Sequence, residues 1–254
     1  MRQALVEDDS SDMPARRFLS LAHTFLGELL MATGDSPGAL EQRLAAWRLQ
    51  QELVRWDSAN VTWQAGLAVS ARLAGLGMVA AGREEEGMAA LLDSRNILLR
   101  LLDRDAASVD YRQELARTES ALAVAYLDDR PDEAAAAARR SLEVLTPLNA
   151  SGGGDSYAAW VESGAYVELG RSLAALGRTA EAREAWTNAL SLLQSVAKDG
   201  GDIDHLATQA STLLHLGRVE EARPIAETLM RRGYRQAEFL ALARRNGLLA
   251  SRTR

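Results

Sequence analysis

The sequence predicts an all-α fold: a right-handed superhelical solenoid of antiparallel helix pairs, with about five repeats and a C-terminal capping helix. Apolar residues recur at spacings of three and four along the chain, which is the period of an amphipathic helix. Val, Ile, Thr and Phe do not cluster in the alternating pattern that marks strands. Turn signals separated by 48, 47, 48 and 40 residues indicate a repeat, and they lie at Gly34, Gly82, Asp129, Gly177 and Gly217.

Each repeat is expected to be a pair of helices joined by a short turn. Ser36-Pro37 begins the second helix of the first pair, since proline is favoured at the first helical position, and Pro131 does so in the third, whose turn is expected to be one residue short. In the fourth pair, Gly177 ends one helix and Thr179 caps the next. We expect a polar lead-in at 1–13, a solenoid at 14–233 with units at about 14–56, 60–104, 108–148, 156–197 and 203–232, and a capping helix with a basic tail at 234–254.

The composition is that of a folded protein and excludes several kinds of site. Of the 254 residues, 47% are hydrophobic and 25% are charged, which is ordinary for a globular chain. Because cysteine is absent, disulfides, zinc–thiolate sites and thiol nucleophiles are excluded. The net charge of −6 argues against general nucleic-acid binding, and no apolar run is long enough to cross a membrane.

Small residues stand where the helices of a pair are expected to cross. In the fourth pair, Gly170 on the first helix and Ala182 on the second are predicted to face each other, because only small side chains let two helix backbones approach closely. Leu169, Leu173 and Trp186 are expected to fill the space around this contact.

These stretches resemble the tetratricopeptide repeat. The sequence YVELGRSL at 166–173, followed by AREAW at 182–186, is similar to that family's pattern, and HTFLGELL at 23–30 is a second close example. The second unit keeps Gly75 and Gly87 at the matching places, and the resemblance extends over roughly residues 18–230. The period of about 48 is longer than the family's usual 34. Such long units look like those in the repeat tails of bacterial signalling proteins, notably transmembrane serine/threonine kinases.

The sequence offers no motif for catalysis, so the protein is not expected to be an enzyme and no cofactor is expected. None of the three histidines pairs with another at the spacing of metal ligands, and no Gly-x-Ser-x-Gly motif occurs. The run REEEG at 83–87, with three acids, is interpreted as solvated charge at a helix start, and the alternative is cation binding. The enzymatic alternative is a helical lyase or hydrolase with an acidic site, which requires a buried, acid-lined cavity with raised carboxyl pKa values.

The concave face formed by the first helices of the pairs is the predicted partner-binding surface. The repeat register places Arg72, Arg117 and Arg171 there, one from each of the three middle units. We hypothesise that they form a ladder that holds a segment of a partner, because guanidinium groups suit carboxylates and peptide carbonyls. The alternative is that they bridge to acids on neighbouring helices. The same register also assigns to this surface Glu28, Leu76, Val124 and Val167.

The resemblance implies a non-enzymatic module that binds a protein or peptide, as the sensory or scaffolding domain of a bacterial signalling protein. We expect no nucleic-acid partner and no membrane insertion of this segment, which is instead expected to be tethered to a span outside it. The expected location is periplasmic, and the alternative is cytoplasmic. A structural alternative is a freestanding adaptor in an envelope or secretion assembly.

Overall fold

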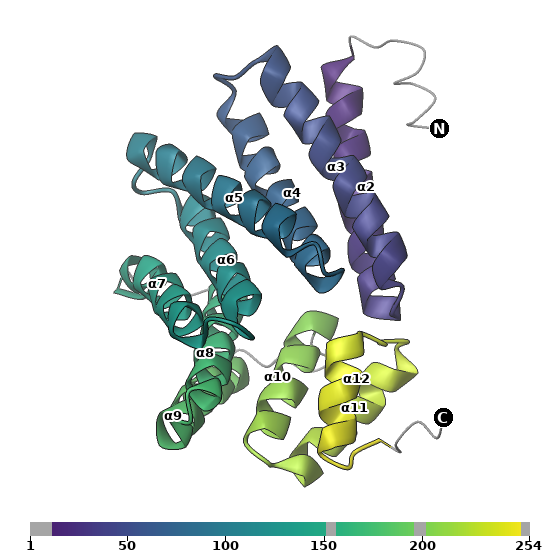
Figure 1. Ribbon diagram of the computed structural model, residues 1–254, viewed down its shortest axis with the longest axis vertical. Coiled ribbons are helices and arrows are strands. Elements are labelled where there is room, and N and C mark those ends of the chain that lie inside the picture. The colour runs from purple at the N-terminus through teal and green to yellow at the C-terminus, as the bar shows by residue number, and fades with distance from the viewer. Residues whose placement is uncertain (1–11, 151–155, 196–201, 250–254) are drawn as a thin grey trace. The chain divides into compact units, whose positions relative to one another are not determined.

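The computed structural model describes residues 12–150, 156–195 and 202–249. Within these ranges the chain forms eleven α-helices and no strand, so the predicted all-α fold is confirmed (Figure 1). The helices are α2 (Met13–Thr33), α3 (Ser36–Trp56), α4 (Val61–Ala80), α5 (Glu84–Arg104), α6 (Val109–Tyr126), α7 (Pro131–Ala150), α8 (Ser156–Ala175), α9 (Thr179–Ser195), α10 (Ile203–His215), α11 (Val219–Arg231) and α12 (Ala237–Arg245).

Consecutive helices pack against one another, and the chain divides into two compact units. The boundary lies within α6, between Ala121 and Leu122, and the short segment Ala32–Gly34 is grouped with the C-terminal unit. The N-terminal unit contains the pairs α2–α3 and α4–α5, and the C-terminal unit contains α7 to α12. None of the described helices combines the length and the apolar character needed to cross a membrane.

Glycine ends the first helix of most pairs, as predicted. Gly82, Gly177 and Gly217 have φ angles of +77°, +74° and +74°, in the left-handed region that favours glycine. In each turn the next residue donates its N–H back across the helix end, for example from Arg178 to the carbonyl of Leu173 at 2.8 Å. This is the Schellman arrangement, and it satisfies carbonyls that the helix itself leaves open.

The third turn is built differently, and its predicted length is wrong. Four residues separate α6 from α7, whereas three separate the helices at Gly82, so the turn is one residue longer rather than shorter. No glycine stands between α6 and α7, and no other described residue type adopts a positive φ angle. Without a left-handed residue the chain needs an extra residue to reverse, before Pro131 begins α7 as predicted.

An arginine, rather than the predicted threonine, precedes the second helix of the fourth pair. Thr179 is the first residue of α9, and the residue before it is Arg178. The Arg178 guanidinium binds the Glu181 carboxylate three residues later with both Nε and Nη2. The same Arg-x-x-Glu clasp begins every second helix from α5 onward, through the pairs Arg83–Glu86, Arg130–Glu133 and Arg218–Glu221.

The small residues at the helix crossings have two different uses. In the second pair the backbones do close as predicted, because a Cβ at Gly75 would lie 2.8 Å from the carbonyl oxygen of Gly87. In the fourth pair the prediction that Gly170 faces Ala182 is wrong in its main contact. The atoms nearest to a Cβ at Gly170 all belong to the indole of Trp186, so this glycine makes room for a ring rather than for a backbone.

Candidate functional site

Two of the predicted ladder arginines meet at one carboxylate in the N-terminal unit. Nη2 of Arg72 on α4 and Nη1 of Arg117 on α6 each lie 3.0 Å from an oxygen of Glu114. Burial alone raises the pKa of Glu114, but the charges and hydrogen bonds of the two arginines outweigh it and lower the pKa. Arg72 is only 4% exposed, so it is not an open cation on a binding surface. Arg72 thus bridges to an acid on a neighbouring helix, as in the alternative, whereas Arg117 pairs with Glu114 of its own helix.

The third arginine occupies a polar cleft in the C-terminal unit. Nη1 of Arg171 lies 3.0 Å from Oε2 of Glu168, and its Nη2 lies 2.6 Å from Oε1 of Glu238 on α12. The side chains of Arg171 and Glu168 are 19% and 15% exposed, whereas that of Glu238 is 57% exposed. Burial raises the pKa of Glu168, and the Arg171 charge opposes this shift without cancelling it.

The cleft has a volume of about 270 Å³ and is formed by α8, α10, α12 and the segment between α11 and α12. Two predicted site residues, Val167 and Arg171, line it. The other lining residues are Trp160, Glu168, Asp204, Ala207, Thr208, Ser211, His215, Tyr234, Gln236, Glu238, Phe239, Leu242 and Arg245.

One lining residue, His215, belongs to a stacked pair of rings. His215 on α10 stacks on Trp186 of α9, with ring centroids 4.9 Å apart and an interplanar angle of 14°. Trp186 in turn donates its Nε1–H to the carbonyl of Val167 at 3.3 Å. Burial, together with the charges of Arg171 and Arg245, lowers the His215 pKa to about 4. The histidine is therefore neutral at pH 7 and adds no positive charge to the cleft.

The lining also contains aromatic and hydroxyl groups, those of Trp160, Thr208 and Tyr234. The Trp160 ring lies 5.6 Å from that of Tyr157 and 5.9 Å from that of His205, centroid to centroid. Its Nε1–H donates to the Thr208 hydroxyl oxygen at 3.3 Å, which fixes the indole at the edge of α10. Near α12, the Tyr234 hydroxyl donates to Oε1 of Gln236, and burial raises the Tyr234 pKa. These groups can hydrogen-bond a peptide segment without supplying charge.

The remaining predicted residues do not join this cleft. Glu28 is exposed on α2 and Leu76 is half-buried on α4, both in the N-terminal unit. Val124 is half-buried on α6, within the C-terminal unit, but it does not line the cleft. The predicted surface is thus represented in the cleft by Val167 and Arg171 alone.

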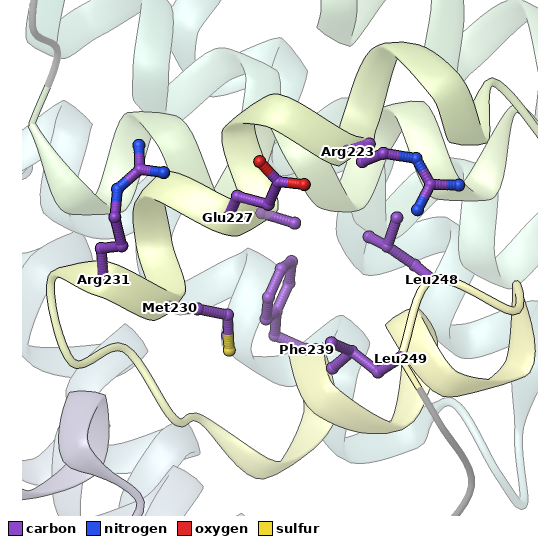
Figure 2. A pocket seen from close by; sticks show the side chains of 8 residues that line it. Arg223, Glu227, Met230, Arg231, Phe239, Leu248 and Leu249 are labelled. Atoms are coloured by element: carbon purple, nitrogen blue, oxygen red, sulfur yellow. The ribbon is translucent and has the colours of Figure 1, made fainter.

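A second, apolar pocket of about 280 Å³ lies on the same unit, between α11, α12 and the segment that follows α12. In Figure 2 the Phe239 ring lies between Met230 and Leu249. The pocket is also lined by Arg223, Ala226, Glu227, Arg231 and Leu248. Because Phe239 also lines the polar cleft, the capping helix takes part in both cavities.

One feature of the cleft agrees with the alternative of a helical enzyme with an acidic site: it contains a buried carboxyl group with a raised pKa. That group, Glu168, is ion-paired with Arg171 through both of its oxygens, at 3.1 and 3.0 Å. A carboxylate fixed in this way is the arrangement of a structural ion pair rather than of a proton-transfer group. In the part of the chain that the structure describes, no three His, Asp or Glu side chains gather so as to hold a metal ion.

Most of the cleft was missed by sequence reasoning. Trp160, His215 and Tyr234 carry the aromatic part, and Glu238 and Arg245 carry charges from the capping helix. They lie on three helices and one connecting segment, separated by up to 85 positions, and no spacing rule joins them. The one available signal was the predicted capping helix, since a helix that covers the last pair must lie beside its first helix.

Comparison with known proteins establishes the fold only. No protein-family model and no curated protein matches the sequence. The chain is similar to the crystal structure of BtubC (BKLC) from P. vanneervenii, with 17% identity and a TM-score of 0.58, over 100% of this chain and 90% of that one. Two further structures have 18% identity and TM-scores of 0.47. TTC0263, a thermophilic TPR protein from Thermus thermophilus, matches over 90% of this chain and 97% of its own, and the assembly chaperone of RpL4 (Acl4) matches over 97% and 93%.

Proposed function

We propose that this chain is a non-enzymatic protein-binding module whose polar cleft binds an acidic side chain of a protein or peptide partner. The observation that supports this most directly is the Arg171–Glu238 ion pair of 2.6 Å. In this pair a cation inside a cleft is held by a carboxylate whose own side chain is 57% exposed. Glu238 therefore occupies the place that a partner's carboxylate would take.

An exchange of carboxylates on Arg171 leaves no buried charge without a partner. When a partner's carboxylate replaces Glu238, the exposed Glu238 side chain returns to water, and Arg171 keeps its hydrogen bonds with Glu168. The guanidinium is never left unpaired, so the large cost of a buried, isolated charge does not arise. Charge-assisted hydrogen bonds to guanidinium groups also have the geometry that distinguishes a carboxylate from a neutral amide.

The segment beside the cleft carries an excess of positive charge. Arg245 is a second cation in the lining, and residues 231–249 contain five arginines but one acid, Glu238, whereas the lining as a whole holds three carboxylates, those of Glu168, Asp204 and Glu238. The positive segment raises the rate at which an acidic partner approaches, and Arg171 and Arg245 are the cations that it meets in the cleft. The hydroxyl groups of Thr208 and Ser211 and the amide of Gln236 supply neutral hydrogen-bonding partners beside it.

Two immobilised decapeptide libraries test the proposal, one with a fixed central Glu and one with a fixed central Gln. We expect the protein to be retained more strongly by the Glu library. The variant Glu238→Gln removes the internal competitor, so its retention by the Glu library is expected to increase. Equal retention of the wild-type protein by the two libraries would contradict the proposal.

A paired substitution provides the loss-of-function control. Arg171→Met together with Glu168→Gln removes the cation without leaving a charged carboxylate buried, so the fold is expected to persist. This double variant should lose the preference for the Glu library and keep its circular dichroism spectrum. Retained preference in a folded double variant would place the acidic-residue site elsewhere.

We propose further that the module is the sensory or scaffolding domain of a bacterial signalling protein and acts in the periplasm. The long-period resemblance to tetratricopeptide tails supports this context. Capture experiments with separated periplasmic and cytoplasmic extracts, each with the wild-type protein and the Arg171–Glu168 double variant, test it. A partner that is enriched from the cytoplasmic extract alone, and lost with the double variant, would overturn the location but keep the binding function.

A further inference from the structure

The outward face of α2 is apolar and exposed. Phe18, Phe25, Leu26 and Leu29 have relative exposures of 47%, 66%, 43% and 60%. The opposite side of the helix packs on α3, through the hydrogen bond from Ser20 to the Ala46 carbonyl and through a close approach at Gly27. Three of the four exposed residues, at positions 18, 25 and 29, follow the spacing of a single helix stripe.

The repeat itself shows what normally covers this stripe. The first two pairs are offset by 48 residues, since Gly27 and Gly34 correspond to Gly75 and Gly82. At the same offset, the stripe residues Phe18, Phe25 and Leu29 correspond in turn to Gly66, Leu73 and Gly77 on α4.

On α4 these positions are covered by the preceding helix, α3. A Cβ at Gly66 would lie 2.7 Å from Oε1 of Gln50, and one at Gly77 would lie 3.0 Å from Cδ1 of Leu40. Leu73 is buried, with 7% exposure. The corresponding stripe of α2 therefore lies in the place where an array of this kind receives another helix, and it carries larger apolar side chains there.

Charged residues flank the stripe in an order that suits one orientation of a second helix. Arg17 and Glu28 project from the same side of α2, 11 residues apart, on either side of the helix centre. If two α2 helices pack antiparallel around a two-fold axis, Arg17 of each copy comes beside Glu28 of the other. Parallel packing around a two-fold axis would instead put Arg17 and Glu28 of the two copies on opposite sides of the interface, where they cannot pair.

We propose that α2 is the interface with a second copy of this chain, packed antiparallel through Phe18, Phe25 and Leu29. A helix of 21 residues is about 31 Å long, so one helix face buries less than the roughly 800 Å² per partner of a standard interface. The dimer is therefore weak, with a dissociation constant in the micromolar range. This inference is independent of the function proposed for the cleft.

Sedimentation velocity at protein concentrations from about 1 to 300 µM tests the interface. The wild-type protein is expected to shift from monomer to dimer over this range. Phe25→Lys should weaken association at least tenfold, because it puts a charge in the middle of the stripe. Leu99→Lys on α5, at a site 40% exposed, is the matched control and should leave association unchanged. A wild-type protein that stays monomeric throughout, or a Phe25→Lys protein that associates like the wild type, overturns the proposal.

Charge reversal tests the orientation. Arg17→Glu and Glu28→Arg should each weaken the dimer by about threefold to tenfold, because every isologous contact occurs twice. The double variant Arg17→Glu/Glu28→Arg should regain wild-type affinity, since it restores opposite charges across the interface. If each single variant weakens the dimer and the double variant stays weak, the antiparallel arrangement is wrong.

Discussion

Protonation of His215 should destabilise the C-terminal unit, because its buried site disfavours the charged imidazole. The imidazole is stacked on Trp186, and burial together with Arg171 and Arg245 lowers its pKa from 6.5 to about 4. In the unfolded chain the group has its ordinary pKa, so between pH 6.5 and pH 4 the unfolded chain binds more protons. The stability that His215 contributes is therefore complete above pH 6.5 and is lost as the pH falls towards 4.

The magnitude follows from these two pKa values. At 1.36 kcal/mol per pKa unit, lowering the pH from 7.5 to 4.5 removes about 2.5 kcal/mol of stability through His215 alone. His215→Phe keeps an aromatic ring on Trp186 and cannot be protonated, so its unfolding free energy should lack this part of the pH dependence. Urea unfolding at the two pH values, followed by the ¹⁹F signal of 5-fluorotryptophan at Trp186, measures the difference for each protein.

A direct titration decides whether the reasoning is sound. The ring protons of the three histidines can be followed by NMR, with the His215 signal assigned by its loss in His215→Phe. We expect that signal to titrate near pH 4. A midpoint near 6.5, or the same loss of stability in the wild-type protein and His215→Phe, would refute burial as the cause of the lowered pKa.

Three further substitutions have effects that the structure predicts. Gly170→Ala should destabilise the C-terminal unit by about 1–3 kcal/mol, because its methyl group overlaps the Trp186 indole. Gly177→Ala, where φ is +74°, should cost about 1–2 kcal/mol, although no atom lies within 4 Å of the new Cβ. Glu114→Gln should cost the N-terminal unit about 3–5 kcal/mol, because it removes a carboxylate that pairs with the buried Arg72 guanidinium. Urea unfolding at pH 7.5 measures all three.

Matched substitutions separate these causes from general effects of mutation. Gly164→Ala lies on the same helix as Gly170, has open space around its Cβ, and should be neutral or stabilising because alanine favours the helix. Glu133→Gln removes an exposed partner of Arg130 and should have little effect on stability. Equal losses at Gly164 and Gly170, or at Glu133 and Glu114, would show that the Trp186 and Arg72 contacts are not the cause.

The fold could be predicted from the sequence because single residues determine where most of its helices end. A left-handed turn residue is almost always glycine, so Gly82, Gly177 and Gly217 marked the repeat directly. The turn before Pro131 shows where this signal ends. It has no glycine, and its length was mispredicted, because a reversal without a left-handed residue has several solutions of different length.

The candidate site was only partly accessible, because a register gives the face of a helix but not the partner of a side chain. The register placed Arg72 and Arg171 on the same kind of surface. In the structure, however, Arg72 forms a buried ion pair with Glu114, whereas Arg171 lines the polar cleft. What separates them is the packing of distant elements. In the C-terminal unit α12 lies beside α10 and brings Glu238 to Arg171, and nothing local in the sequence fixes that approach.

The two proposals have a common physical basis in how an apolar helix face of a repeat array is covered. At the C-terminal end, α12 buries Phe239, Leu242 and Ala243 against the last pair, and the polar cleft is formed where it does so. At α2, the corresponding apolar stripe is exposed, with Phe25 at 66%. Arrays of stacked repeats need such a surface to be polar or covered, because an exposed apolar face of this size promotes association. A capping helix from the same chain in one case, and a helix from a second copy in the other, are two solutions to the same requirement.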